Sequence, residues 1–137
     1  NVSFPRTDTG DKFEMIARLI DGHEIRGKNR DLFFVELHGY DHHNQIKSNA
    51  DSKLKEVNDA LEALVEELKH QGRWNEVAII ATSDFGRTLS PNSNEGSDHA
   101  WGGHYWMLGG SVKGGQILNK YPDDLSNTSP LNTGRGR

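Results

Sequence analysis

The run VAIIAT at residues 77–82 is apolar except for its last residue, and the polar stretch SDFG at residues 83–86 follows it at once. A short run of branched apolar residues that ends at turn residues is typical of a buried strand. A second run of this kind, DLFFVEL at residues 31–37, ends at His38-Gly39. We therefore predict two buried strands, over residues 31–37 and 77–82.

Between the two runs lies the clearest periodic segment of the chain, residues 50–70. Its apolar residues recur at helical spacing and form one stripe: Leu54, Val57, Leu61, Leu64, Val65 and Leu68. Charged residues lie elsewhere on the segment, which predicts an amphipathic helix. A strand, a helix and a strand in this order form a βαβ unit with parallel strands. We expect the fold class α/β, with a partial doubly wound, mostly parallel sheet and flanking helices.

The rest of the chain adds two shorter elements and a tail. Residues 8–21 carry apolar side chains at near-helical spacing, and Gly22 can end that helix. Residues 105–108 have the profile of a third short strand, and residues 121–137 predict an extended tail. Neither end resembles the natural terminus of a compact fold, so we expect a piece of a longer protein.

Composition narrows the classes of function. The 137 residues include 16 Lys and Arg against 20 Asp and Glu, a formal net charge of −4. This mildly acidic balance argues against a nucleic-acid-binding protein, which usually carries a basic face. No stretch is long and apolar enough to span a membrane. Cysteine is absent, whereas histidine occurs seven times and glycine 15 times, so metal binding would fall to Asp and His.

The first candidate site follows the strand predicted at residues 31–37. The stretch HGYDHHNQ at residues 38–45 carries His38, Asp41, His42 and His43. Imidazole and carboxylate together suit Zn, Mn or Fe better than Ca or Mg. The alternative is a polar loop that caps the next helix. Three histidines and an aspartate within six positions favour a metal or catalytic site.

Two more polar loops carry candidate residues. The stretch SDFGRT at residues 83–88 offers Asp84 as a carboxylate and Arg87 as a clamp for an anionic oxygen, or else a helix N-cap beside a solvated Arg87. The stretch GSDHAWGGH at residues 96–104 offers Asp98 and two histidines, although His104 can equally be a backbone-bonded residue at the start of a strand. Ligands bind open α/β sheets at the carboxyl edge of the strands. We therefore expect the loops at residues 38–45 and 83–88 to converge there.

The order of these motifs resembles that of an uncharacterised bacterial family within the alkaline phosphatase/sulfatase-like superfamily. The resemblance covers about residues 4–137, and GSDHAWGGH with the following GGSVKGG at residues 109–115 is its most specific part. It implies a sheet of the alkaline phosphatase-like type with metal ligands at the carboxyl ends of strands. It also implies that residues 1–137 are the C-terminal part of one such domain, and that the nucleophile, a Ser, a Thr or a modified residue, would precede residue 1.

The resemblance also implies which residues bind metal. Five positions match ligands of the superfamily, with His99 and His104 competing for the late histidine: Asp41, His43, Asp84, His99 and His104. Further candidates for the same site are His38, His42 and Asp98. Arg87 is the candidate catalytic residue. Phe85 follows Asp84 where the superfamily usually has a histidine.

These observations lead to one expected function and two alternatives. We expect a metal-dependent hydrolase of phosphate or sulfate esters that uses divalent ions, Zn foremost and otherwise Mn, Mg or Ca. Its substrate would be a small anionic ester. We also expect a homo-oligomer, and a location in the bacterial periplasm or outside the cell after export. The alternatives are a non-catalytic binding or assembly protein on the same scaffold and a metal-dependent phosphomutase or nuclease.

Overall fold

The computed structural model describes residues 2–135. Its regular elements are α1 (Asp8–Asp21), α2 (Ile46–His70), the 3-10 helix η1 (Trp74–Glu76), β1 (Ala78–Ala81), β2 (Gly86–Arg87), β3 (His99–Ala100) and β4 (Trp106–Gly109). The chain divides into two compact units. Unit 1 comprises Asn1–Gly39 and Asp51–Glu76, and unit 2 comprises Tyr40–Ala50 and Val77–Arg137. Each unit is described by itself.

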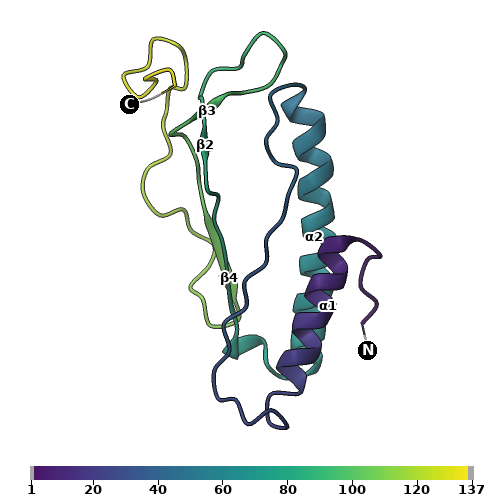
Figure 1. Ribbon diagram of the computed structural model, residues 1–137. Coiled ribbons are helices and arrows are strands. Elements are labelled where there is room, and N and C mark those ends of the chain that lie inside the picture. The colour runs from purple at the N-terminus through teal and green to yellow at the C-terminus, as the bar shows by residue number, and fades with distance from the viewer. Residues whose placement is uncertain (1, 136–137) are drawn as a thin grey trace. The chain divides into compact units, whose positions relative to one another are not determined.

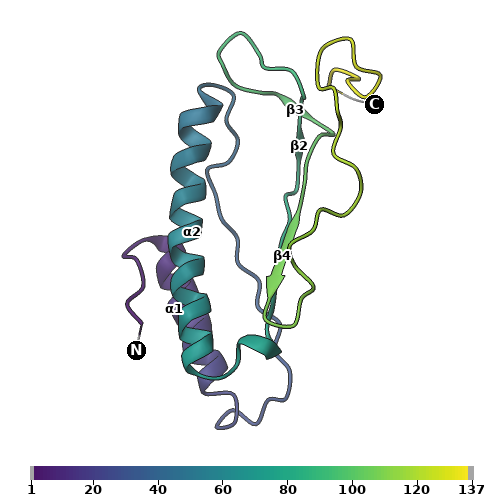
Figure 2. The same ribbon diagram turned by 180° about the vertical axis from the view of Figure 1, so that it is seen from behind.

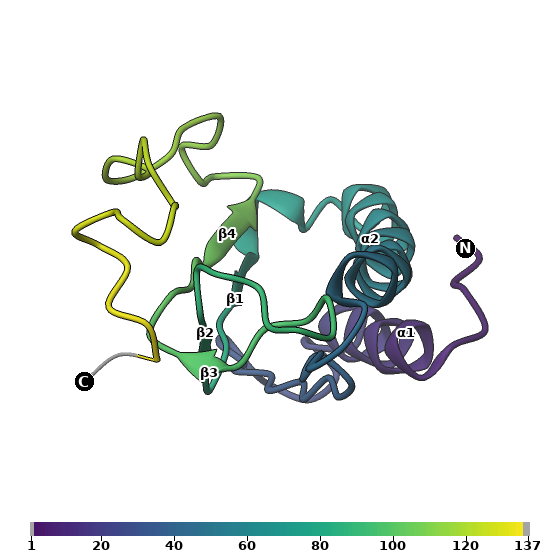
Figure 3. The same cartoon turned by 90° about the horizontal axis from the view of Figure 1, so that it is seen from above.

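Unit 1 is a pair of helices that lie side by side (Figures 1 and 3). The hydroxyl of Thr9 donates to Glu56 at 2.6 Å, and the side-chain amide of Gln71 donates to the carbonyl of Ala17 at 3.2 Å. Thr9 precedes Ala17 in α1, and their partners Glu56 and Gln71 follow each other in the same order. The helices α1 and α2 therefore run in the same direction. The side chain of Thr7 caps α1 by accepting from the backbone N–H of Gly10.

Both predicted helices are confirmed, and three of the six stripe residues predicted for the second one, Val57, Leu64 and Leu68, lie in the core of unit 1, whereas Leu54 is exposed. The helix predicted at residues 8–21 has these bounds in the structure, and the one predicted at residues 50–70 begins four residues earlier, at Ile46. All buried apolar side chains of the described residues lie in unit 1: Phe4, Phe13, Ala17, Val57, Ala60, Ala63, Leu64 and Leu68. Ala60 and Ala63 of α2 are buried as well, although neither belongs to the predicted stripe.

The strand predicted at residues 31–37 is wrong. This segment is extended but forms no strand pairing, and the side chains of Leu32 and Phe34 are 98% and 90% exposed. Its residues alternate between exposed and half-buried, as in a strand that has one covered face. An apolar run supplies the side chains for a buried strand but does not specify a hydrogen-bonding partner.

Unit 2 is built on two short antiparallel strand pairs. β1 pairs with β4, with Ala78 opposite Gly109 and Ala81 opposite Trp106. β2 pairs with β3, which sets Arg87 opposite His99. The chain passes from β1 to β2, turns through residues 88–98 and returns from β3 to β4, so the two pairs belong to one long antiparallel excursion (Figure 2).

The expected doubly wound parallel sheet is therefore contradicted. The apolar run at residues 77–82 does form a strand, but it is not the buried strand that we predicted, because its residues alternate between exposed and half-buried and Ile80 is 62% exposed. Residues 105–108 come close to the observed β4. These two strands pair antiparallel with each other, and neither pairs with residues 31–37. Because β1 and β4 pair antiparallel within one excursion of the chain, they need no crossover connection of the kind that joins parallel strands.

Two further expectations concern the chain as a whole. Residues 121–135 form no helix or strand, and Asn132 fixes this segment by donating to the hydroxyl of Ser90 at 2.7 Å. Gly136 and Arg137, the end of the predicted tail, lie outside the described residues. Within residues 2–135, no helix combines the length and the apolar character that crossing a membrane would require.

Candidate metal site

The candidate site lies in unit 2, where the loop before α2 is joined to the turn between β2 and β3. Three backbone hydrogen bonds make this connection: Gln45 N–H to Asn94 O at 3.0 Å, Ile46 N–H to Glu95 O at 2.9 Å and Ser97 N–H to His42 O at 3.2 Å. A Cβ atom on Gly96 would lie 2.1 Å from the carbonyl carbon of His43. Only glycine allows the two segments to approach this closely.

This connection brings three side chains of distant sequence position together. The ring nitrogens of His43 and His99 and a carboxylate oxygen of Asp41 all lie within 4.8 Å of one another. The Nε2 atoms of both histidines lie 2.9 Å from Oδ1 of Asp41. All three side chains are exposed. The loops that supply these three side chains are those at residues 38–45 and 96–104. Of the loop at residues 83–88, which was expected to meet the first one, Arg87 reaches Asp41 but Asp84 does not join the group. The parallel sheet that was expected to bring the loops together is not found among residues 2–135.

A second carboxylate lies behind His43. The Nδ1 atom of His43 is 3.1 Å from Oδ1 of Asp98, on the opposite side of the ring from Asp41. Histidine ligands of metals usually donate their other ring N–H to a carboxylate or carbonyl, which fixes the orientation of the ring. Asp98 therefore occupies the place of an orienting partner rather than that of a ligand.

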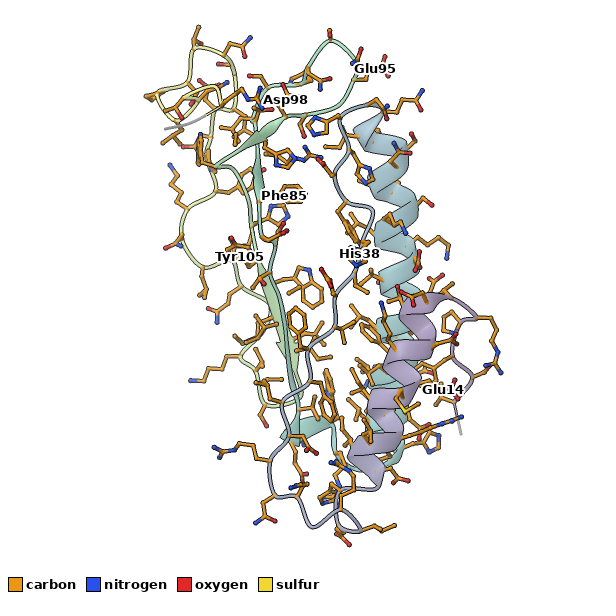
Figure 4. The ribbon with its side chains drawn as sticks, viewed as in Figure 1. Glu14, His38, Phe85, Glu95, Asp98 and Tyr105 are labelled. Atoms are coloured by element: carbon orange, nitrogen blue, oxygen red, sulfur yellow. The ribbon has the colours of Figure 1, made fainter. Side chains whose placement is uncertain are left out.

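Aromatic rings align the two histidines. The rings of His43 and His99 stack at 5.2 Å between centroids with an interplanar angle of 11°. Phe85 stacks on His99 at 4.5 Å and 21°. Figure 4 shows Phe85 and Asp98 beside the β2–β3 pair, whereas Tyr105 lies farther along, towards β4. Phe85 thus packs against a candidate ligand instead of supplying one.

Arg87 is committed to the site itself. Its Nη2 lies 2.8 Å from Oδ1 of Asp41 and donates to the carbonyl of Tyr40 at 3.4 Å, and its Nη1 donates to the carbonyl of Ser97 at 3.0 Å. The guanidinium also lies over the ring of Phe85, at 5.1 Å from the centroid. With a side chain only 17% exposed, Arg87 is placed to hold Asp41 in position rather than to reach an anion in solvent.

Both carboxylates are held in their ionised form. Burial acts to raise the pKa of Asp41, but the hydrogen bond from His99 and the charges of His43, His99 and Arg87 together lower it. The pKa of Asp98 is lowered first by the hydrogen bond from Asn92 and then by that from His43, against the effect of burial. Ionised carboxylates are the form that binds cations and accepts hydrogen bonds.

The position of His43 between two carboxylates has a chemical consequence. An ionised carboxylate only accepts hydrogen bonds, and a neutral imidazole carries a single N–H. His43 can therefore donate to Asp41 or to Asp98, and its other nitrogen then turns a lone pair towards a carboxylate oxygen. A second proton or a bound cation relieves this repulsion. The donor set of one Asp and two His is suited to Zn, Mn or Fe(II).

Four sequence-predicted residues do not join this cluster. Asp84 and His104 are exposed and lie outside the group of candidate ligands found among residues 2–135. His38 belongs to unit 1, where its Nε2 lies 3.7 Å from a carboxylate oxygen of Glu36. His42 is half-buried, and its Nε2 has no hydrogen-bond partner among the described residues.

One residue of the site carries no signal of metal binding in the sequence. Asn92 donates to the carbonyl of His43 at 2.9 Å and to Oδ1 of Asp98 at 3.2 Å. Its Oδ1 accepts from the backbone N–H groups of Asn94 and Gly96. The stretch Asn92-Ser93-Asn94-Glu95-Gly96 is typical of a turn in which an Asn side chain bonds the following backbone, and that is the only signal that could have found it.

Comparison with known proteins gives one match. The family model described as "Protein of unknown function (DUF1501)" matches residues 11–131, which include the loops of both candidate histidine ligands. No curated protein and no solved structure matches the chain.

Proposed function

We propose that this chain, which belongs to the family described as "Protein of unknown function (DUF1501)", binds one divalent metal ion and is part of a metal-dependent hydrolase of phosphate or sulfate esters. The observation that carries the proposal is the convergence of His43, His99 and Asp41, with ligand atoms within 4.8 Å of one another. Three protein ligands are the number that catalytic zinc sites use when the fourth position is left for water or substrate.

The surrounding residues support a metal site rather than a chance meeting of exposed polar groups. Asp98 stands at the far nitrogen of His43, as the orienting carboxylates of metal-bound histidines do. Arg87 fixes the carboxylate of Asp41, and Phe85 fixes the ring of His99. Each of the three candidate ligands therefore has its own partner that restricts its orientation.

The proposed chemistry assigns separate roles to metal and protein. A divalent ion bound in such a site would supply polarisation of an ester oxygen and neutralisation of charge on the leaving group. His43, His99 and Asp41 would hold it, while Asp98 and Arg87 keep these side chains aimed at one point. Phosphate or sulfate esters are proposed as the substrate class from the order of the sequence motifs alone, which resembles that of the alkaline phosphatase/sulfatase-like superfamily, because residues 2–135 lack the parallel sheet that the same resemblance implied.

The first experiment measures zinc binding by titration calorimetry, with two matched pairs of variants. His99→Ala removes a proposed ligand, whereas His104→Ala removes an exposed histidine outside the cluster. Asp41→Asn and Asp84→Asn form the corresponding carboxylate pair. We expect the first member of each pair to weaken zinc binding by more than about 100-fold, because even an outer-shell partner typically costs about 10–100-fold. The second members should bind as the unchanged protein does.

A metal-free protein at saturating zinc, or equal losses within each pair, contradicts the proposed site. Activity is then measured on phosphomonoester, phosphodiester and sulfate ester substrates with the metal-loaded protein. A metal-binding role without catalysis is the second candidate function, because Arg87 already donates within the site and is not free to bind an anion. Zinc binding without hydrolysis of any of the three ester classes would favour that candidate.

A further inference from the structure

Asn92 holds both members of the His43–Asp98 pair with one side-chain amide. Its Nδ2 lies 2.9 Å from the carbonyl oxygen of His43 and 3.2 Å from Oδ1 of Asp98. The distance between His43 Nδ1 and Asp98 Oδ1 is 3.1 Å. The amide therefore fixes the backbone that carries the imidazole and the carboxylate that faces it, and so sets the spacing between them.

The orientation of this amide is determined by its four partners. Its Oδ1 accepts from the backbone N–H of Asn94 at 2.9 Å and from that of Gly96 at 3.0 Å. Its Nδ2 faces two acceptors, the carbonyl of His43 and the carboxylate of Asp98. The reversed amide would set an oxygen against two acceptors and an NH2 group against two donors, so only one orientation satisfies all four contacts.

We propose that Asn92 is the positioning residue that selects which ring nitrogen of His43 is offered to the metal, an inference that rests on the proposed metal-binding function. By holding Asp98 against Nδ1, Asn92 places the single N–H of the neutral ring on Nδ1. The lone pair is then on Nε2, which is the nitrogen that faces Asp41 at 2.9 Å. The same Oδ1 of Asp41 also lies 2.8 Å from the guanidinium of Arg87 and 2.9 Å from Nε2 of His99, and an oxygen shared in this way competes less well for the proton of His43.

The test separates the two halves of the Asn92 side chain. Asn92→Asp keeps an oxygen for the N–H groups of Asn94 and Gly96 and replaces the donor to Asp98 and His43 by an acceptor. Asn94→Asp is the matched control, because it adds the same charge to the same turn while the contacts of Asn94 are made by its backbone. Ring ¹⁵N chemical shifts of His43 are recorded in metal-free protein, at alkaline pH where they no longer change, and zinc affinity is measured separately by calorimetry.

In the unchanged protein and in Asn94→Asp, we expect the ¹⁵N pattern of an imidazole protonated at Nδ1. In Asn92→Asp we expect a mixture of the two tautomers and a loss of zinc affinity of about tenfold, at the lower end for an outer-shell partner. The helices of Asn92→Asp should unfold at the same denaturant concentration as those of the unchanged protein. A merely structural role for Asn92 predicts the reverse, an unaltered tautomer together with lower stability.

Two results overturn the inference. One is an unchanged protein whose His43 is protonated at Nε2, a result that does not depend on whether any variant folds. The other is an Asn92→Asp protein that keeps the Nδ1-protonated pattern. Because the tautomer is read without metal, a failure of the unchanged protein to bind zinc overturns the proposed function alone, and the ¹⁵N result still decides the role of Asn92.

Discussion

The two units of this chain are stabilised by different forces. Unit 1 contains all eight buried apolar side chains of the described residues, on α1, α2 and the segment before α1. As far as unit 2 is described, to residue 135, its buried residues are Gly96, Ser97 and Ser129, none of which has a large apolar side chain. Unit 2 is held instead by short strand pairs, turn hydrogen bonds and the charged cluster around Asp41. Burial should therefore determine the stability of unit 1, and charge and bound cations that of unit 2.

The largest effect expected from this comparison is in the core of unit 1. Leu68 is fully buried, whereas Leu54 of the same helix is 58% exposed. Leu68→Ala should lower the free energy of unfolding by about 2–5 kcal/mol, because it removes buried methyl groups and leaves a cavity. Leu54→Ala should cost within about 0.5 kcal/mol. Urea unfolding followed by far-UV circular dichroism measures both, and equal losses would show that α2 is not stabilised by this core.

Zinc should affect only unit 2. At a free concentration of about 100 times Kd, zinc stabilises a state that binds it by about 2.7 kcal/mol, which is about a 100-fold change in an opening equilibrium. Amide hydrogen exchange at Ile46 and Ser97, which donate across the two loops of the site, should slow by about that factor. The amides of Leu64 and Leu68 in α2 should exchange at unchanged rates. If zinc slowed amide exchange equally in both units, the conclusion that the two units are stabilised by different forces would be contradicted.

Gly96→Ala tests the close approach that assembles the site. A Cβ at this position would lie 2.1 Å from the carbonyl carbon of His43, so the two loops must separate. We expect zinc affinity to fall at least about tenfold, because the ligands lose their fixed spacing. Gly114→Ala is the matched control, since a Cβ there meets no atom within 4 Å. Calorimetry should show no loss for the control, and a similar loss for both variants would remove the role assigned to Gly96.

The sequence predicted the helices better than the strands and their pairing, for a physical reason. A helix makes its own hydrogen bonds, so the apolar stripe of residues 50–70 is sufficient to indicate the element. It indicates the buried face in part, since Val57, Leu64 and Leu68 are buried and Leu54 is 58% exposed. A strand needs a partner, and nothing in residues 31–37 or 77–82 specifies one. The prediction of parallel pairing failed at this step. β1 pairs with β4 instead, a segment that the sequence marks only as a third short strand.

In the candidate site too, the chemistry of a residue could be predicted from the sequence, whereas the contacts it makes could not. Asp41, His43, His99 and Asp98 could be predicted because their side chains are suited to metal binding, and the structure brings these four together. Asp84 and His104 have the same chemistry but lie outside the cluster. Asn92 has no metal-binding chemistry of its own and acts through contacts six residues away at Asp98 and 49 residues away at His43. Such contacts depend on the turn and loop geometry and are invisible in the residue types.

The smallest predicted effect concerns a polar contact within unit 1, the unit that contains the buried apolar side chains. The pKa of Glu56 is lowered first by the hydrogen bond from the buried hydroxyl of Thr9 and, after the opposing effect of burial, by Lys53. A lowered pKa means that ionised Glu56 stabilises the folded state above the unfolded-state pKa of about 4.3. This contribution is lost as the pH falls through the lower folded-state pKa. Thr9→Val should therefore raise the pKa of Glu56 and lower the free energy of unfolding by about 1 kcal/mol at neutral pH.

Lys53→Met is the matched comparison, because it removes the weaker of the two partners, whose Nζ lies 3.4 Å from Glu56 against 2.6 Å for the Thr9 hydroxyl. A ¹³C titration of the Glu56 carboxyl should show the larger upward shift in Thr9→Val and a smaller one in Lys53→Met. The reverse order would mean that charge rather than a buried hydrogen bond controls this carboxylate. Unit 1 would then share the electrostatic character of unit 2, and the contrast between the two units would hold only for their apolar side chains.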